Sequence, residues 1–385
     1  MKKVLFAGGG TGGHVYMGIA LAAELRKEGP AVEVCFAGSE RGIENRIIPG
    51  LGYRLETIRL GGLKNVGSWQ TIRTLAQLPL AVINSLRIIR SFNPSIIVCV
   101  GGYSAGPLAL AGWILRVPIL LIEPNAFPGL TNRMLSRFAR GAALAWEESS
   151  SFFPAGKKIT GIPVRPEFHQ IPRAHSSDGR RIRLLVFGGS QGSRPINRLM
   201  VKALPFLAMN TFSIVHQTGP LDFEEVRNGY ADQGWKDAEI IDYIDDMPDR
   251  FEWCDLVLSR SGASTVAEVA ASGRASILIP FPQAADNHQK KNALAMTRRE
   301  AAVCLDQEGL TGEMLAEVLN RVSRDRARLK DMAWRAGELA RPDSSRKIVE
   351  FMRQLAGRGS KATSEMEEES QTARKRGGRT GSAGS

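Results

Sequence analysis

The chain has 385 residues and carries a net charge of +12, with 43% hydrophobic and 23% charged residues. A chain of this length is too long to fold around one hydrophobic core of ordinary size, so we expect two domains. Residues 1–163 hold 18 Lys and Arg against 9 Glu and no Asp, so the basic excess lies in the N-terminal half. An anionic lipid or nucleic acid would match that charge, and so would a surface that only maintains solubility. The four scattered cysteines indicate neither a disulfide framework nor a zinc site, as expected in a reducing cytoplasm.

Strand-like and helix-like segments alternate along the chain, which is typical of parallel sheets covered by helices. The uncharged stretch 95–115 is long enough to span a bilayer, but Gly101 to Pro107 divides it into a strand and a helix. We expect a linker over 162–183, and a disordered tail over 357–385, which is Gly, Ser, Glu, Lys and Arg almost throughout. The predicted strands lie near 3–7, 31–36, 53–58, 96–100, 118–122, 142–145, 157–160, 184–187, 212–216, 238–241, 255–258, 275–279 and 301–305. The predicted helices are 20–27, 72–90, 108–115, 131–138, 310–339 and 344–355.

Two glycine-rich turns, each directly after a short apolar strand, stand 180 residues apart. They are Gly8 to Gly13 and Gly188 to Gly192. Glycine allows a polyanion to approach main-chain N–H groups, so the pair predicts two Rossmann-like halves facing a cleft. The first turn also fits a dinucleotide fingerprint, with Glu40 as the acid for the ribose. His14 follows it at a helix start, where a histidine acts as a general base, donates to a phosphate or caps the helix.

The segment Ser259 to Glu268 follows a strand and places small residues at the start of a helix, which favours phosphate binding. Glu268 lies about a turn and a half along that helix, where its carboxylate would accept hydrogen bonds from a ribose diol or simply face water. Polar residues from Gln283 to Gln289 follow the next strand, where ligands of open α/β sheets bind. The sequence has no Asp-x-Asp motif and no His/Asp cluster with metal spacing. We therefore expect a diphosphate to be neutralised by helix N-termini and arginines, without a metal or other cofactor.

Several motifs occur in an order that resembles the MurG family of bacterial glycosyltransferases over residues 1–355. They are Gly-Gly-Thr-Gly-Gly-His at 9–14, Gly-Gly-Tyr at 101–103, Glu123 to Asn132, Gly161 to Arg165, Gly-Gly-Ser-Gln-Gly at 188–192, Tyr-Ile-Asp-Asp-Met at 243–247 and Arg-Ser-Gly-Ala-Ser-Thr-Val-Ala-Glu at 260–268. Met17, Ser104-Ala105, Pro124 and His288 depart from the family pattern.

The resemblance implies an α/β GT-B fold of two Rossmann-like domains with parallel sheets facing a central cleft. The domains would be an acceptor and membrane-facing domain, 1–163, and a donor-binding domain, 164–343, with helix 344–355 packing back on the first. It implies inverting transfer of N-acetylglucosamine from UDP-N-acetylglucosamine to the 4-hydroxyl of the muramyl sugar of lipid I, giving lipid II, with His14 as the base. The donor contacts that it implies are Thr11, Gly12, Gly13, Asn125, Arg165, Ser190, Ile244, Ala263, Ser264, Thr265, Val266, Ala267, Glu268 and Gln289.

A lipid-linked acceptor requires access to a membrane surface. The stretch 72–92 and the cluster at 113–116 combine apolar residues with arginines, which suits an interfacial helix at anionic headgroups or a core-facing helix. The basic N-terminal half favours the first interpretation, with the protein on the cytoplasmic face of the membrane and cell-wall synthesis proteins as candidate partners. The expected membrane contacts are Leu78, Ile83, Leu86, Arg87, Arg90 and Trp113.

Four other functions are open to this sequence. A UDP-sugar 2-epimerase would share the fold and the donor, but it needs a pair of acid/base carboxylates that the motifs lack. The Ser/Thr/Glu helix at 263–268 argues against an NAD-dependent oxidoreductase. A catalytically idle scaffold would tolerate damaged loops, and these loops are intact. Nucleic-acid binding rests on charge alone, without a recognised motif, so we do not expect it.

Overall fold

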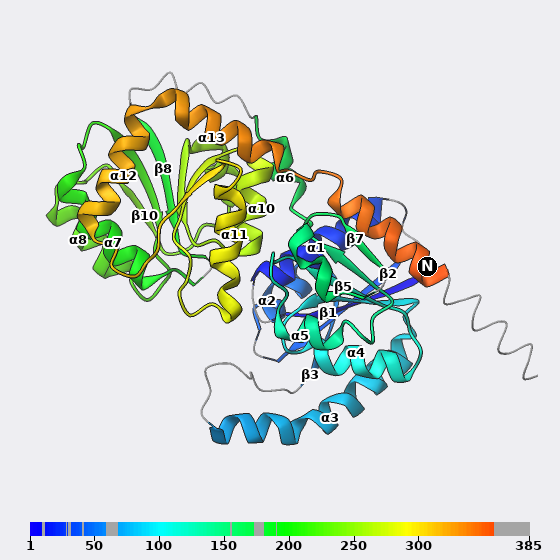
Figure 1. Cartoon of the computed structure of the whole chain (residues 1–385). Helices are drawn as coiled ribbons and strands as arrows, with labels where there is room; N and C mark the ends of the chain where they lie inside the picture. The colour runs from blue at the N-terminus through cyan, green and yellow to red at the C-terminus, as the bar shows by residue number, and fades with distance from the viewer. Residues whose placement is uncertain are drawn as a thin grey trace, which may run out of the picture.

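The structure is a computed structural model. It describes residues 1–9, 12–27, 29, 32–40, 42–58, 68–154, 156–172, 181–189 and 191–357, with the backbone alone for 68–76 and 285. The predicted tail, from residue 358 on, lies outside the described residues. Figure 1 shows two α/β units side by side, each a sheet covered by helices. Each described sheet is entirely parallel.

The N-terminal sheet has seven strands in the order β3-β2-β1-β4-β5-β6-β7. Its strands are β1 (Lys3–Gly8), β2 (Glu33–Ser39), β3 (Arg54–Ile58), β4 (Ile96–Gly101), β5 (Ile119–Glu123), β6 (Gly141–Leu144) and β7 (Lys157–Ile159). Its helices are α1 (Gly12–Lys27), α2 (Glu44–Gly50), α3 (Ser68–Phe92), α4 (Ala105–Ile114), α5 (Leu130–Leu135) and the 3-10 helix η1 (Glu147–Phe152).

The C-terminal sheet has six strands in the order β10-β9-β8-β11-β12-β13, which repeats the strand order of the first. Its strands are β8 (Ile182–Phe187), β9 (Phe212–Gln217), β10 (Glu239–Ile241), β11 (Leu256–Ser259), β12 (Ala275–Leu278) and β13 (Ala302–Cys304). Its helices, with the linker helix α6 before them, are α6 (Pro166–Gln170), α7 (Arg194–Ala203), α8 (Phe223–Asp232), α9 (Met247–Trp253), α10 (Ala263–Ser272), α11 (His288–Thr297), α12 (Gly312–Arg324) and α13 (Arg326–Glu338); η2 (Leu204–Phe206) and η3 (Ala285–Asn287) are 3-10 turns.

Alternate residues of β1, the first strand of the N-terminal sheet, pack into different hydrophobic clusters on the two faces of that sheet. In β1, Val4 and Phe6 belong to a cluster that includes α1, whereas Leu5 and Ala7 belong to one that includes α3 and α4. Both faces are therefore covered, as parallel sheets require. The α/β class and the two parallel sheets predicted from sequence are confirmed.

The helix at 344–357 crosses back from the C-terminal unit and lies against the N-terminal one (Figure 1). Ile348, Phe351 and Met352 are buried in the same cluster as α1, and a Cβ at Gly141 would lie only 2.6 Å from the Phe351 ring. The Ser344 hydroxyl donates to the Ile162 carbonyl oxygen at 2.7 Å. The chain thus passes between the two units twice, once before β8 and once after α13.

Several expectations differ from the structure in detail. The segment 310–339 forms two helices, α12 and α13, because the chain leaves helical geometry at Asp325, which caps α13. The first helix begins at Gly12 rather than Ala20, because the glycines that close the first turn already have helical backbone. The expected linker 162–183 contains α6, whose Phe168 is fully buried and packs edge-to-face on Phe251. Among the described helices, none has both the length and the apolar character needed to cross a membrane. The stretch 95–115 contains the whole of β4 and of α4.

Candidate active site

The first glycine turn lies directly against the end of β4. A Cβ at Gly8 would come within 2.1 Å of the Gly101 carbonyl oxygen, and one at Gly102 within 2.5 Å of the Gly9 oxygen. Gly101 has φ +107° and Gly102 φ +88°, a backbone that side chains rarely adopt. A Cβ at Gly101 would also lie 2.7 Å from Nε2 of His14, in the first turn of α1. Glycines thus create the space that the half-buried His14 imidazole occupies, at the switch point between β1 and β4.

A buried carboxylate organises the loop after β5. Glu123 is 1% exposed, and burial raises its pKa, while the surrounding donors oppose that change. Its Oε1 accepts from the backbone N and the Nδ2 of Asn125, at 3.0 and 3.1 Å. Its Oε2 accepts from the Gly129 backbone N at 3.1 Å and from Asn132 Nδ2 at 2.9 Å. Asn125, an expected donor contact, is therefore held in place from within its own domain.

Helix α10 of the C-terminal unit meets α1 across the cleft. A Cβ at Gly13 would lie 3.0 Å from the Ser264 Oγ. Ala263 and Ala267 pack against the N-terminal core cluster. Gly262, with extended backbone, precedes the first residue of α10, so the N-terminus of this helix opens beside the His14 turn. A phosphate group in the cleft would meet the free N–H groups at both helix starts.

Glu268, on α10, lies in the same interface, where burial and a neighbouring positive charge act on the pKa of its carboxyl group in opposite directions. Burial raises its pKa to about 7, and the neighbouring positive charge of Arg165 opposes that rise. The Arg165 guanidinium stacks 5.0 Å from the ring centroids of Tyr16 and Phe168. The Tyr16 hydroxyl is hydrogen-bonded to Tyr243, and burial raises its pKa. Residues from both domains therefore surround the Glu268 carboxyl group.

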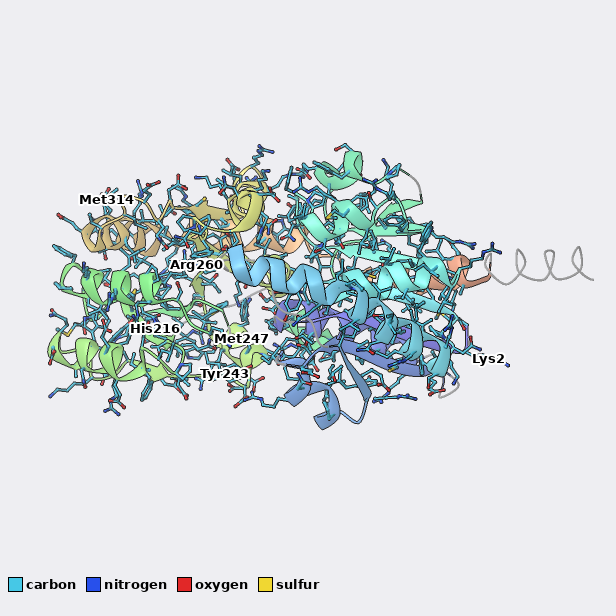
Figure 2. All side chains as sticks on the ribbon, turned by 90° about the horizontal axis from the view of Figure 1, so that it is seen from below. Lys2, His216, Tyr243, Met247, Arg260 and Met314 are labelled. Carbon is cyan, nitrogen blue, oxygen red and sulfur yellow. The ribbon has the colours of Figure 1, made fainter. Side chains whose placement is uncertain are left out.

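The expected contacts Ile244 and Gln289 are anchored by neighbouring polar groups. The Ile244 backbone N donates to Gln217 Oε1 at 3.2 Å, and Gln217 Nε2 donates to the Gly189 oxygen of the second glycine turn at 2.8 Å. The Phe281 backbone N donates to Gln289 Oε1 at 2.9 Å. Ile244 is 4% exposed, and the adjacent Tyr243 lies on the side of the C-terminal unit that faces the other domain (Figure 2).

The structure places most of the residues expected to contact the donor at one interface, and two of them lie outside the part of the chain that it describes. Thr11 and Ser190 lie outside the described residues. Thr265 and Val266 are buried, and Val266 packs into the C-terminal core while it also lines the interdomain cavity described below. Gly12 and Gly13 form the first turn of α1. Within the described ranges, no group of three or more His, Cys, Asp or Glu residues could hold a metal ion.

Arg260 is a site residue that the sequence analysis did not single out. It is 7% exposed, and its guanidinium donates to Ser193 Oγ at 2.9 Å, to the Ile279 oxygen at 3.0 Å and to Gln307 Oε1 at 2.6 Å. Burial lowers its pKa to about 10, which still leaves it charged at neutral pH. It thus places a positive charge beside Ser193, which directly follows the second glycine turn, just before the start of α10. Its position in the Arg-Ser-Gly motif was the available signal.

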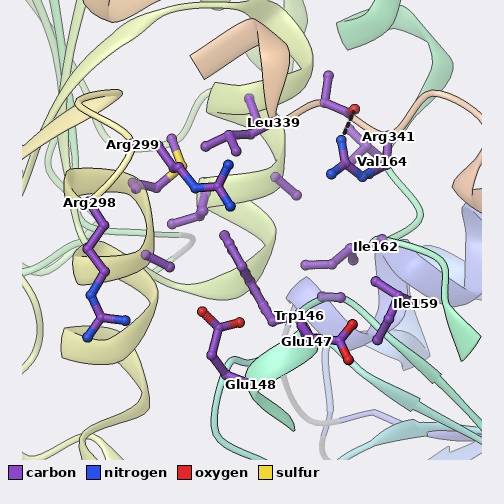
Figure 3. Close-up of a pocket in the computed structure, with 18 of the residues that line it drawn as sticks. Trp146, Glu147, Glu148, Ile159, Ile162, Val164, Arg298, Arg299, Leu339 and Arg341 are labelled. Atoms are coloured by element: carbon purple, nitrogen blue, oxygen red, sulfur yellow. Dashed lines mark hydrogen bonds between the residues drawn. The ribbon is translucent and has the colours of Figure 1, made fainter. Parts of the chain in front are cut away.

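An interdomain cavity of about 420 Å³ lies along the two chain crossings. Glu147 and Glu148 line it from the N-terminal unit, and Arg298 and Arg299 line it from the end of α11 (Figure 3). Arg341, beside the second crossing, completes its wall. The cavity shares Val266 and Ala267 of α10 with the interface around Glu268, so it continues the cleft toward the crossings.

The expected membrane contacts lie on another face of the N-terminal unit. Leu80 on α3 is 64% exposed and Trp113 on α4 is 52% exposed, while Leu86 is half-buried against the core. Helices α3 and α4 run side by side on the same side of the sheet (Figure 1). The exposed side chains of this face are Leu78, Leu80, Ile83, Arg87, Arg90, Trp113 and Ile114.

Comparisons with family models, with related sequences and with solved structures agree on one family. Residues 4–144 match the glycosyltransferase family 28 N-terminal domain, and residues 183–348 match its C-terminal domain. The UDP-N-acetylglucosamine--N-acetylmuramyl-(pentapeptide) pyrophosphoryl-undecaprenol N-acetylglucosamine transferase of Myxococcus xanthus is 44% identical over 91% of this chain and 92% of its own. The transferase of the same name from Geobacter sulfurreducens is 41% identical over 91% and 98%.

Among solved structures, MurG of Acinetobacter baumannii aligns with a TM-score of 0.75 and 29% identity, over 92% of this chain and 100% of that one. A UDP-GlcNAc 2-epimerase from Neisseria meningitidis aligns with a TM-score of 0.63 but 15% identity, over 91% and 100%, so it shares the fold alone. The predicted GT-B fold is confirmed. The chain belongs to the MurG family of the family 28 glycosyltransferases.

Proposed function

We propose that this protein transfers N-acetylglucosamine from UDP-N-acetylglucosamine to N-acetylmuramyl-(pentapeptide) pyrophosphoryl-undecaprenol, converting lipid I to lipid II. Relatives at 44% and 41% identity, aligned over nearly their whole length, bear the name of this reaction. The observation that carries the proposal is the meeting of α1 and α10, which brings His14 and a helix N-terminus to the same cleft.

The donor binds mainly to the C-terminal domain in this proposal. Its diphosphate lies at the N-terminus of α10 and at the second glycine turn, where N–H groups and the Arg260 charge neutralise it without a metal ion. Glu268 accepts hydrogen bonds from the ribose hydroxyls, and the Arg165 charge opposes the rise in its pKa that burial causes. The backbone around Ile244 contacts the uracil base of the donor. The remaining donor contacts are Thr11, Gly12, Gly13, Asn125, Ser190, Ala263, Ser264, Thr265, Val266, Ala267 and Gln289.

The transfer is a single displacement. His14 accepts the proton of the muramyl 4-hydroxyl, and that oxygen attacks the anomeric carbon of the donor sugar. The bond from the anomeric carbon to the β-phosphate oxygen breaks, and UDP leaves with the electron pair. One displacement inverts the configuration at the anomeric carbon. The negative charge that develops on the leaving diphosphate is stabilised by the helix N-termini and by Arg260.

The acceptor reaches this site from a membrane in the proposal, with the protein peripheral on its cytoplasmic face. Exposed Leu78, Ile83 and Trp113, together with Leu80, enter the headgroup boundary, while Arg87 and Arg90 contact anionic headgroups. The excess of Lys and Arg over residues 1–163 supports this orientation. Because binding strength at a membrane surface scales with the apolar area that is buried, these few side chains would attach the protein reversibly.

A transfer assay tests the proposed function. The full chain is incubated with UDP-N-acetylglucosamine labelled in the sugar, with and without lipid I, and the label in the lipid phase is counted. We expect label in lipid only when lipid I is present. Donor consumption without an acceptor would instead favour an epimerase or a hydrolase. The His14→Ala variant, which should retain donor binding, controls for a contaminating transferase.

A further inference from the structure

A buried carboxyl group lies directly against the first glycine turn. Glu44, the first residue of α2, is 2% exposed. Its Oε1 accepts hydrogen bonds from the Ser39 backbone N at 2.8 Å and from the Ser39 hydroxyl at 2.9 Å. Ser39 is the last residue of β2, which pairs with β1, so these bonds tie the start of α2 to the strand ends beside the turn. Because a buried carboxyl group depends on such bonds, they fix where its oxygens lie.

Three glycines make room for this carboxyl group. A Cβ at Gly38 would lie 2.7 Å from the Glu44 Oε1, and one at Gly42 would lie closer still to Oε2. A Cβ at Gly9 would collide with the same group, since its three nearest heavy atoms are Oε1, Cδ and Oε2 of Glu44. The carboxyl group therefore contacts the backbone of three segments, and these contacts, with the Ser39 bonds, leave it little space to move.

Gly9 also contacts the turn after β4, and that turn contacts His14. A Cβ at Gly102 would lie 2.5 Å from the Gly9 carbonyl oxygen and 3.3 Å from its backbone N. A Cβ at the neighbouring Gly101 would lie 2.7 Å from Nε2 of His14. One continuous set of close contacts thus runs from the Glu44 carboxyl group through the backbone of Gly9 and of the β4 turn to the imidazole.

The acidic residue at this strand end is not the one that a dinucleotide site would use. Glu40, the acid expected for a ribose, is exposed, whereas Glu44 is buried against the turn. Its two hydrogen bonds from Ser39 and its contacts with glycine backbone are all internal to the N-terminal unit. A side chain so placed acts on the position of the turn.

We propose that Glu44 is a positioning residue for His14: its carboxyl group supports the first glycine turn against the turn after β4 and so determines where the imidazole lies. Without the carboxyl group, the turn relaxes into the space beside Gly9, and the His14 ring moves relative to Gly101. Glu44 itself is too buried to contact a substrate. The effect on sugar transfer rests on the proposed function, whereas the effect on the position of the ring does not.

The first test compares Glu44→Ala with Ile48→Ala. Ile48 is the matched control because it is fully buried one turn later on α2, in the N-terminal core. We expect Glu44→Ala to lower kcat for transfer about tenfold or more, since a small displacement of a catalytic group is costly. Ile48→Ala should lower the melting temperature but keep kcat within about twofold of wild type. The Kd for UDP should stay within about twofold in both variants, because the C-terminal domain supplies most of the proposed UDP contacts.

A double-mutant cycle tests the contact itself. Gly9 does not have a φ in the left-handed region, so an alanine there meets the Glu44 carboxyl group rather than backbone strain. Gly9→Ala should therefore lower kcat about tenfold or more, and the Gly9→Ala, Glu44→Ala double variant should exceed the Gly9→Ala variant, because the methyl group enters the vacated space. Losses that multiply in the double variant would overturn the proposal.

Nuclear magnetic resonance of protein labelled with ¹³C at histidine Cε1 gives a readout that lost stability alone would not move. The His14 signal is assigned by its absence in His14→Ala. We expect Glu44→Ala to shift this signal and to leave that of His216, buried in the other domain, unchanged. Ile48→Ala should shift neither. An unshifted His14 signal in Glu44→Ala would overturn the proposal even where the melting temperature falls.

Folding and function are controlled separately. If Glu44→Ala fails to fold by circular dichroism, Glu44→Asp replaces it in every measurement, because it keeps a carboxyl group but withdraws it from Gly9 by one methylene. If the wild-type protein transfers no sugar, the proposed function fails, and the His14 signal alone then decides whether Glu44 positions the ring. If transfer is observed and the Glu44 variant keeps kcat within about twofold of wild type, the positioning role is rejected.

Discussion

The ionisation of Glu268 should control binding of the sugar nucleotide. Its pKa is raised to about 7, and a ribose diol binds the ionised carboxylate. With this pKa, the ionised fraction rises from roughly one tenth at pH 6 to roughly nine tenths at pH 8. The Kd for UDP-N-acetylglucosamine should therefore fall about tenfold over this interval. Glu268→Gln should bind more weakly at pH 8 and show little change with pH.

Isothermal titration calorimetry between pH 6 and 8 measures this effect. UDP-N-acetylglucosamine is the right ligand because its β-phosphate is esterified to the sugar and has no ionisation in this range, whereas the terminal phosphate of UDP titrates near pH 6. Glu317→Gln, an exposed residue on α12, is the matched control and should keep the wild-type slope. A wild-type Kd that changes less than about twofold, or a Glu268→Gln variant with the same slope, would refute the ribose role of Glu268.

The same pKa shift predicts how stability depends on pH. The folded protein keeps the Glu268 proton up to about pH 7, whereas the model value for the unfolded chain is 4.5. The stability of the folded state therefore falls as the pH rises through this window, because ionisation is more costly in the folded state. Glu268→Gln should raise the free energy of unfolding at pH 8 by about 1–3 kcal/mol and change it little at pH 4. Urea unfolding of both proteins at the two pH values measures this difference, and an equal or lower stability of the variant at pH 8 would contradict it.

Other substitutions probe separate parts of the molecule. His14→Ala should reduce kcat for transfer by about 10²–10⁴ with little change in UDP affinity, and near-normal turnover would remove His14 as the base. Gly101→Ala should lower turnover about as strongly, because the new Cβ displaces the His14 ring and strains a φ of +107°; a fully active variant would contradict this packing. The pair Leu80→Asp and Ile83→Asp should weaken sedimentation with anionic vesicles severalfold, while Leu221→Asp, exposed on the other domain, should not, and equal binding by all would argue against the α3 face.

The sequence by itself determined the class of fold and the positions of its strands. Short apolar runs ending in glycine specify strand-to-turn junctions locally, because only glycine tolerates the φ of +135° at Gly8 so close to β4. Repetition of that junction at domain spacing therefore predicted two similar halves. Each predicted strand corresponds to one in the structure, with bounds that differ by a few residues.

Ordered motifs also predicted the family and the segments that approach the cleft. They did not predict which side chains of those segments meet. Val266 shares a motif with Glu268, yet it lies two residues earlier, about 200° around the helix, and packs into the C-terminal core. Motif order specifies a segment, whereas the orientation of each side chain depends on the packing of its helix.

Only the tertiary structure decided the contacts between residues distant in sequence. Asn125 and Asn292 lie 167 positions apart, and neither their pairing nor the burial of Asn292 follows from a local pattern. The pKa of Glu268 likewise depends on how completely the other domain covers it and on Arg165 beyond the first chain crossing. Local sequence specifies backbone conformation, but desolvation and hydrogen bonding across an interface depend on how two folded units meet.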